Sequence, residues 1–147
     1  MELKVKKFNE LTTAELYELL RARSEVFVVG QKCAYQDMDG RDYRSLHFFY
    51  EEKGRVAACL RAFSREGEEG TLQIGRVLTV EHGRGMGRRL LEESIKFIRE
   101  KTEAKRLFME AQEYAAGFYE KFGFTVTSDV FLEDGIPHVA MELDLRI

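Results

Sequence analysis

Three glycines at alternate positions, Gly83, Gly85 and Gly87, stand between a strand-like and a helix-like segment. The preceding residues, 71–80, are apolar and β-branched as in a buried strand, and the following residues carry leucine and isoleucine at helical spacing. Glycines let the backbone turn sharply, and the first N–H groups of a helix lack internal partners and carry positive partial charge. Such a turn binds phosphate, and Arg84, Arg88 and Arg89 add charge there.

The spacing of this turn excludes two nucleotide-binding motifs. There is no GxxxxGK[ST], so the lysine of a P-loop is missing, and the third glycine comes one residue early for the dinucleotide pattern GxGxxG. Two interpretations of the glycine turn remain: it holds a diphosphate mainly by backbone amides, or it is a tight connection without a ligand.

Two segments resemble the GNAT N-acetyltransferase superfamily. HGRGMGRRLL (82–91) resembles its acetyl-CoA loop, Gln/Arg-x-x-Gly-x-Gly/Ala, with His82 at the first position. QEYAAGFYEKFGF (112–124) resembles the family segment N-x-x-A-x-x-x-Y-x-K-x-G-F, with Gln112 in place of asparagine. LLRARSEVFVVGQKCAYQDMDGRD (19–42) and EDGIPHVAM (133–141) further resemble the ElaA-like branch, so the likeness covers nearly the whole chain.

The resemblance implies that acetyl-CoA is the acyl donor. It also implies a bulge that splays the central strand from the strand that follows, so that the pantetheine arm enters the gap beside residues 78–80 and the glycine turn holds the diphosphate. The residues expected to contact acetyl-CoA are Leu78, Thr79, Val80, Gly83, Arg84, Gly85, Met86, Gly87, Arg88, Gln112 and Tyr119.

Tyr119 is the expected catalytic acid, because the resemblance places its hydroxyl near the thioester sulfur. A phenol with an ordinary pKa of about 10 can donate a proton to a departing thiolate. The alternative is an aromatic residue that only packs the core. An amine acceptor arrives protonated, and His138 or Glu110 is the expected base, with His47 a further candidate.

Charged residues elsewhere leave alternatives open. Asp37, Asp39 and Asp42 form an acidic segment that can attract an ammonium group, or be ordinary surface charge. Arg61 and Arg76 lie on predicted strands, where they either bind an anionic group of the acceptor or pair with carboxylates.

The predicted activity is transfer of the acetyl group of acetyl-CoA to a primary amine by direct attack in a ternary complex. The acceptor, a small molecule or a peptide, is not identified by the sequence. The alternative is a module that binds CoA or acyl-CoA without turnover, and a plain nucleotide-phosphate binder ranks last.

Composition agrees with a single domain over residues 1–147. The chain is 44% hydrophobic and 33% charged, lacks an apolar run long enough for a bilayer, and begins without a secretory signal, so we expect a cytoplasmic protein that does not bind membranes. A net charge of −3 and a pI near 5.7 argue against nucleic-acid binding. The only cysteines, Cys33 and Cys59, are expected to be reduced, and no metal site is expected.

Apolar periodicity and turn residues predict the element order β-α-β-β-β-α-β-α-β-β, with FTVTSDVFLE (124–133) as one strand. A Thr-x-x-Glu capping box at Thr12 begins the first helix, and Lys53-Gly54 and Asp134-Gly135 are hairpin turns. The fold class is α+β (mixed α/β), with one largely antiparallel sheet and helices on both faces. Exposed strands can also pair between chains, so a homodimer is possible.

Overall fold

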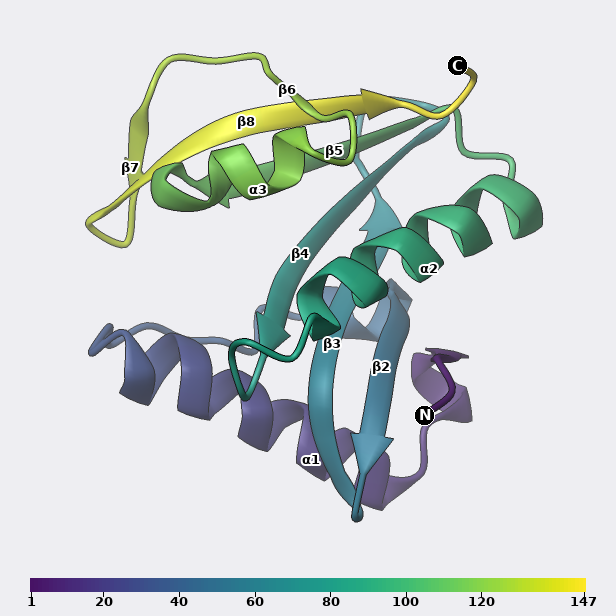
Figure 1. Ribbon diagram of the computed structural model, residues 1–147, viewed down its shortest axis with the longest axis vertical. Helices are drawn as coiled ribbons and strands as arrows, with labels where there is room; N and C mark the ends of the chain where they lie inside the picture. The colour runs from purple at the N-terminus through teal and green to yellow at the C-terminus, as the bar shows by residue number, and fades with distance from the viewer.

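The computed structural model describes residues 1–147, which form one eight-stranded sheet and three α-helices (Figure 1). None of the helices is long and apolar enough to cross a membrane. The strands are β1 (Lys4–Lys7), β2 (Leu46–Glu52), β3 (Arg55–Ser64), β4 (Thr71–Thr79), β5 (Arg106–Gln112), β6 (Thr125–Val126), β7 (Phe131–Glu133) and β8 (Ile136–Asp144). The helices are α1 (Thr13–Arg23), α2 (Met86–Lys101) and α3 (Ala116–Glu120).

The sheet is largely antiparallel, in the order β1-β2-β3-β4-β5-β8-β6, and β7 pairs with the other end of β8. The β4–β5 pair is the only parallel one, and α2 is its crossover helix. The predicted fold class is therefore confirmed.

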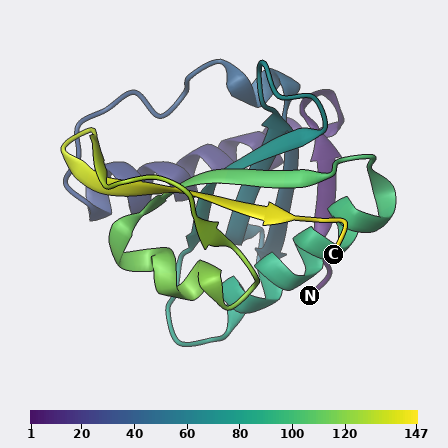
Figure 2. The same cartoon turned by 90° about the horizontal axis from the view of Figure 1, so that it is seen from above.

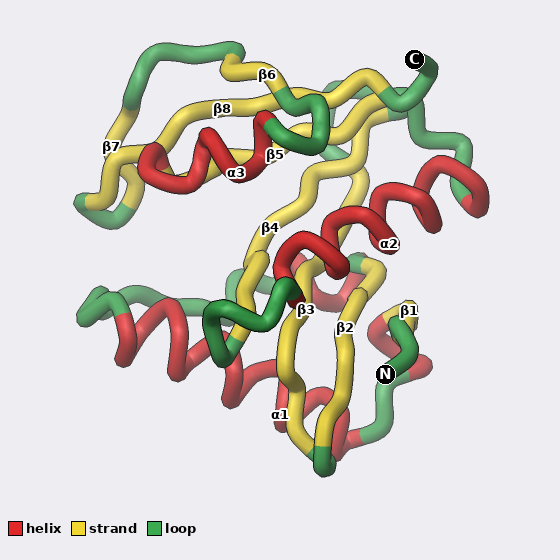
Figure 3. The backbone as a smooth tube through the Cα atoms, viewed as in Figure 1, coloured by secondary structure: helices red, strands yellow, loops and turns green.

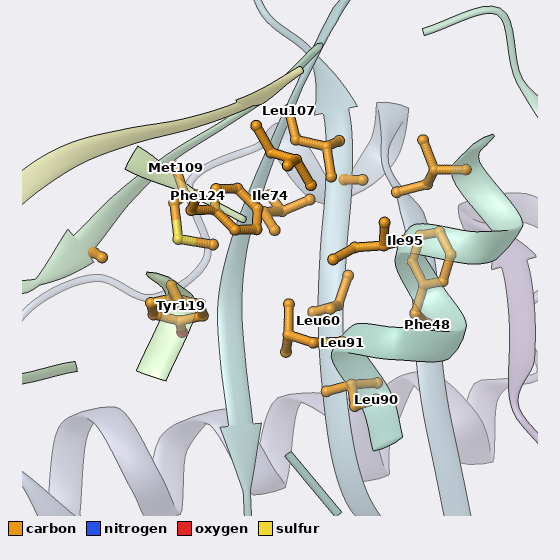
Figure 4. Close-up of a cluster of buried hydrophobic side chains, with 14 of the residues drawn as sticks. Phe48, Leu60, Ile74, Leu90, Leu91, Ile95, Leu107, Met109, Tyr119 and Phe124 are labelled. Carbon is orange, nitrogen blue, oxygen red and sulfur yellow. The ribbon is translucent and has the colours of Figure 1, made fainter. Parts of the chain in front are cut away.

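Helices cover both faces of the sheet (Figure 2). Neighbouring residues of a strand point to opposite faces, so Phe48 and Phe49 of β2 belong to different hydrophobic clusters. Phe48 packs in the larger cluster with Leu90 and Leu91 of α2 (Figure 4). Phe49 packs in the smaller cluster with Leu19 of α1. The sheet is thus buried between α1 on one side and α2 and α3 on the other.

Strands β4 and β5 pair over a short length and then separate. Their ladder runs only from Thr71 to Gln73 on β4, and Figure 3 shows the two strands diverging beyond it. The register between β3 and β4 shifts between Cys59 and Arg61, so β4 carries one extra residue, and Arg76 there adopts a left-handed backbone with φ of 50°. The bulge and the splay that the family resemblance implied are both present.

The chain between β5 and the carboxyl terminus differs in part from the prediction. The expected single strand FTVTSDVFLE is wrong over residues 127–130, which lie between the two short strands β6 and β7. The Ser128 hydroxyl accepts a hydrogen bond from the Ala140 amide at 2.9 Å, so a side chain replaces the ladder partner there. The two predicted hairpin turns form, with positive φ at Lys53 and Gly54 and at Asp134 and Gly135.

Helix α1 begins with the predicted capping box. The Glu15 amide donates to the Thr12 hydroxyl at 3.0 Å, and the Glu15 carboxylate accepts from the Thr12 amide at 2.8 Å. The same carboxylate accepts from the Lys6 ammonium at 2.9 Å, which joins α1 to β1. After α1 the chain continues as a π-helix, Ser24–Gly30, before the long loop that precedes β2.

We predict that Glu15→Gln lowers the free energy of unfolding by about 1 kcal/mol at pH 6, because glutamine can still accept from the Thr12 amide but cannot pair with the ammonium groups of Lys6 and Lys4. Burial alone raises the pKa of Glu15, but the Thr12 amide and Lys6 outweigh it and hold the pKa at about 2, against an ordinary value of 4.5. The stabilisation is therefore complete above pH 4.5 and is lost as the pH falls toward 2. Urea unfolding at pH 6 and pH 3 measures this loss.

Glu15→Gln should lose less stability between pH 6 and pH 3 than the unmodified protein does. Glu103→Gln is the matched control, because Glu103 is exposed and forms no ion pair. An equal loss in all three proteins would contradict the assignment.

Candidate active site

A cavity of about 370 Å³ lies where β4 and β5 separate. Ile74 and Val77 of β4 form one wall, and Met109 and Ala111 of β5 form the opposite wall. The loop that precedes β2, the β7–β8 hairpin and α3 close its remaining sides. Beyond Gln73, β4 has no ladder partner on its β5 side, so backbone groups that a sheet normally pairs are left for a ligand.

The glycine turn lies between β4 and α2 and has the conformation that its sequence predicted. Gly83 and Gly85 have φ of 80° and 71°, and Gly85 directly precedes the first residue of α2. A Cβ atom at either position would meet nothing within 4 Å, so the turn faces open space. The amides of the first turn of this 16-residue helix have no intrahelical acceptor. The turn therefore offers the bare N–H groups that a diphosphate requires.

The arginines of the turn are paired with carboxylates. Arg84 donates two hydrogen bonds to Glu52 of β2, at 2.8 and 2.7 Å, and Arg88 donates one to Glu92 at 2.8 Å. Both pairs are solvent-exposed. The side chain of Met86 is buried in the core, so this residue presents only its backbone to the turn.

Three residues predicted to line the donor, Leu78, Thr79 and Val80, lie between the cavity and the glycine turn. The cavity lining on β4 extends from Gln73 only to Val77. The Leu78 side chain packs in the cluster under α1, and the Val80 amide donates to the Ala57 carbonyl at 2.9 Å. Leu78 and Thr79 also pair with β3, so any contact from this segment uses the backbone edge that faces β5.

Tyr119 projects from α3 into the space beside Met109 and Phe124 (Figure 4). Its side chain lines the cavity and is only 9% exposed, and its hydroxyl has no hydrogen-bond partner in the protein. Burial raises the pKa of Tyr119 to about 12, so the phenol keeps its proton at neutral pH. The geometry provides an available donor in an apolar wall.

The two predicted base candidates lie on paired strands at the opposite wall. Glu110 of β5 is exposed to the cavity and has no ion-pair partner, and His138 of β8 is 8% exposed. The His138 Nδ1 lies 2.7 Å from the Ile136 carbonyl oxygen, and its Nε2 lies 3.5 Å from a carboxylate oxygen of Glu133. His47 is elsewhere, buried against the Asp42 carbonyl, with its pKa lowered by burial.

The acidic segment 37–42 is part of a buried network of ion pairs. Asp42 accepts hydrogen bonds from Arg23 at 2.7 Å and from Arg61 at 3.1 Å. The remaining pairs are Arg23 with Asp37 at 2.8 Å, Arg61 with Asp39 at 2.6 Å and Arg76 with Asp37 at 2.8 Å. The structural pairing of Arg61 and Arg76 is confirmed, and Asp37 and Asp42 are not the free acidic mouth that the sequence suggested.

This network fixes one wall of the cavity. Tyr35 donates a hydrogen bond to Asp37 at 2.9 Å and lies beneath the Arg76 guanidinium, 5.4 Å from ring centroid to Cζ. Burial opposes charge on Asp39 and Asp42, but the arginine hydrogen bonds outweigh it and lower the pKa of both carboxyls. The loop is thus held by charge pairs that stay ionised across the physiological range.

Four further residues line the cavity: Gln31, Cys33, Gln112 and Glu133. Gln112, at the end of β5, exchanges side-chain hydrogen bonds with Gln31 at 3.1 and 3.2 Å, which joins β5 to the loop after α1. Glu133 was missed from the sequence, although it directly precedes the predicted Asp134-Gly135 turn and faces His138 across it. Cys33 also lines the cavity, whereas Cys59 is buried beneath α1; both thiols are free.

Comparison with known proteins identifies the family to which this fold belongs. The acetyltransferase (GNAT) domain family matches residues 10–145. A UPF0039 protein of Schizosaccharomyces pombe is 37% identical over 149 residues, covering 99% of this chain and 98% of the relative. Protein ElaA of Escherichia coli is 34% identical over 137 residues, covering 90% of each chain.

Solved structures agree with the sequence relatives. The crystal structure of an acyl-CoA N-acyltransferase from Pseudomonas aeruginosa has a TM-score of 0.90 at 35% identity and covers 97% of this chain and 99% of that one. Escherichia coli ElaA has a TM-score of 0.90 at 31% identity and covers 98% and 100%. The chain therefore has the acyl-CoA acyltransferase fold, and its sheet opens beside the glycine turn. The chain belongs to the GNAT acetyltransferase family, in its ElaA-like branch.

We predict that Asp42→Asn lowers the free energy of unfolding by about 3 kcal/mol, because it leaves the buried Arg23 and Arg61 with one negative charge too few. The substitution keeps the side chain's size, so packing is not the cause. Chemical unfolding at pH 7 measures the change. Asp129→Asn, at an exposed aspartate, is the control and should change stability by less than about 0.5 kcal/mol. Equal small effects would show that the network does not stabilise the fold.

Proposed function

We propose that this protein transfers the acetyl group of acetyl-CoA to a primary amine by direct attack in a ternary complex. The observation that carries the proposal is that β4, whose edge toward β5 is unpaired beyond Gln73 and lines the cavity, leads directly along the chain into the glycine turn at the start of α2. The membership of the GNAT family supports acyl transfer, and the acetyl group and the amine are the specific parts of the proposal.

The residues present fit coenzyme A as donor. The bare amides at Gly85 and Gly87 suit the diphosphate, and the apolar walls at Val77 and Ala111 suit the pantetheine arm. Gly87 lies close to α3, since a Cβ atom there would meet Phe118 at 3.5 Å. When bound, the thioester supplies an electrophilic carbonyl carbon and a thiolate leaving group.

The side chains around the cavity divide the proton transfers between two walls. Tyr119 holds a proton at its hydroxyl for the leaving sulfur. His138 and Glu110 lie on the acceptor's side as proton acceptors. Unpaired backbone amides of β4 polarise the carbonyl as charge develops on it.

The alternative function is a module that binds CoA or an acyl-CoA without turnover. The variant positions favour it: His82 is exposed, and the Gln112 side chain is engaged with Gln31. Thiol release with acetyl-CoA and a panel of amines separates the two, because a binding module gains thermal stability from the donor and releases no thiol.

We predict that CoA binds the glycine turn with measurable heat in titration calorimetry, and that Gly85→Ala weakens binding about tenfold or more. Alanine disfavours φ of 71°, so the turn and its amides must shift. Gly67→Ala is the matched control, because Gly67 has φ of 79°, is equally open and lies in the β3–β4 turn. Gly67→Ala should lose a similar amount of stability and bind CoA with unchanged affinity. No heat with the unmodified protein would refute the donor assignment.

We predict that Tyr119→Phe lowers kcat by about 100-fold or more and leaves the Kd for CoA within about threefold. The substitution removes the hydroxyl group that donates the proton but changes the side-chain volume little. Steady-state thiol release measures kcat, and titration calorimetry measures the Kd for CoA. Tyr43→Phe, at a tyrosine that is 75% exposed, is the control. Undiminished turnover in Tyr119→Phe would eliminate the acid role.

A further inference from the structure

Three carboxylates line the cavity without a lysine or arginine partner. They are Glu110 of β5 and Glu133 and Asp134 of the β7–β8 hairpin, and we call them the acidic wall. Their only ion-pair contact within 4.0 Å is between Glu133 and His138. Asp39, the carboxylate that lines the other end of the cavity, is by contrast paired with Arg61. The acidic wall is therefore the part of the cavity that lacks positive charge.

Two buried polar groups point to a ligand at the same place. His138 is about nine-tenths buried, and the Ile136 carbonyl can only accept, so the contact at 2.7 Å fixes the proton of the neutral ring on Nδ1. With a neutral ring, Nε2 and the Glu133 carboxylate oxygen 3.5 Å away are both acceptors, and no third group of the protein donates to either atom. Tyr119, also about nine-tenths buried, has an unpartnered hydroxyl in the same cavity.

A donor that enters the cavity can contact both members of this pair. A protonated amine is such a donor, since its N–H groups can contact the carboxylate and the ring nitrogen together. Burial, and then the neighbouring charge of Glu110, raise the pKa of Glu133 and outweigh the opposing charges of His138 and Arg76.

The arginines at the opposite end of the cavity are largely compensated by their own carboxylates, although the charge of Arg76 still opposes the rise in the pKa of Glu133. Arg23, Arg61 and Arg76 face Asp37, Asp39 and Asp42, so that network is neutral overall. Only Arg41 adds an extra positive charge, and it is half-exposed, with its nearest carboxylate, Asp39, at 3.8 Å. The field in the cavity is therefore set by the acidic wall.

We propose that the acidic wall is the acceptor site and that it selects an amine with further positive charge over one with a carboxylate. This inference rests on the proposed acetyl transfer. One ammonium group neutralises one of three carboxylates, so a second cationic group in the acceptor remains favoured, whereas an anionic group is repelled by the same wall. Glu133 and His138 contact the reacting nitrogen, and Glu110 attracts the rest of the acceptor.

The proton balance of the transfer fits these positions. The ammonium loses one proton to Nε2 of His138, which returns it to solvent, and the free amine forms the N–C bond while the thioester C–S bond breaks. The sulfur takes the proton of Tyr119, and the second nitrogen proton restores the phenol. The products are the N-acetyl amine, CoA thiol and one released proton.

The test uses three acceptors of similar length: cadaverine, pentylamine and 5-aminopentanoate, which carry a cationic, a neutral and an anionic far end. We predict that kcat/KM for thiol release with acetyl-CoA falls in that order, by about tenfold or more between the first and the last. In Glu133→Gln and Glu110→Gln the ratio between cadaverine and 5-aminopentanoate should fall at least threefold. Glu113→Gln, at an exposed glutamate outside the cavity, should keep it.

Calorimetry of the same three compounds with the CoA-saturated protein provides a readout that does not depend on turnover. Preferential binding of cadaverine, lost in Glu133→Gln, supports the acidic wall as the acceptor site. Turnover or binding that ignores the charge of the far end, or that prefers 5-aminopentanoate, overturns this inference and leaves acetyl transfer intact. Absence of CoA binding overturns the proposed function itself, and CoA binding with neither turnover nor binding of cadaverine overturns the acceptor site.

Discussion

The separation of β4 from β5 is the feature on which the rest of this structure depends. A buried strand normally satisfies its backbone groups on both sides, and here β4 does so on its β5 side only as far as Gln73. The bulge at Arg76 turns the strand away, at the cost of a left-handed backbone at a residue with a side chain. The ion pair between Arg76 and Asp37 holds that conformation from the neighbouring loop. The gap is thus built into the folded state before any ligand arrives.

Charged residues have two distinct uses around that gap. Where arginines and aspartates alternate, as at Arg23, Asp42 and Arg61, they neutralise one another in the interior and fix the loop that closes one side of the cavity. Where carboxylates have no arginine or lysine partner, as at Glu110 and Glu133, they leave a local negative field that a cationic ligand would compensate. The positions of charged residues in the sequence do not distinguish paired carboxylates from unpaired ones, because both kinds occur near aromatic residues.

Local signals in the sequence predicted much of this fold. The capping box at Thr12, the hairpin turns and the glycine turn depend on residues within a few positions of one another, and each formed as expected. The break in the strand 124–133 did not, because a hydrogen bond from the Ala140 amide to Ser128 replaces a ladder contact there. The partners of Arg61 and Arg76 and the position of Glu133 depend on contacts between distant segments. The family resemblance indicated the splay, but spacing alone could not place side chains on its walls.

The arrangement of the walls also fits the two opposite proton transfers that the proposed reaction requires. Acceptance of a proton from an ammonium group and donation of a proton to sulfur require groups that do not neutralise each other. Tyr119 stands on α3 within apolar neighbours, and burial keeps its proton in place. His138 stands on β8, with its tautomer fixed by a backbone carbonyl and a carboxylate beside its free nitrogen. Strand β5 lies between the two, because it pairs with β8 and continues into α3. Strand β5 therefore sets the distance between Tyr119 and His138, which both line the cavity.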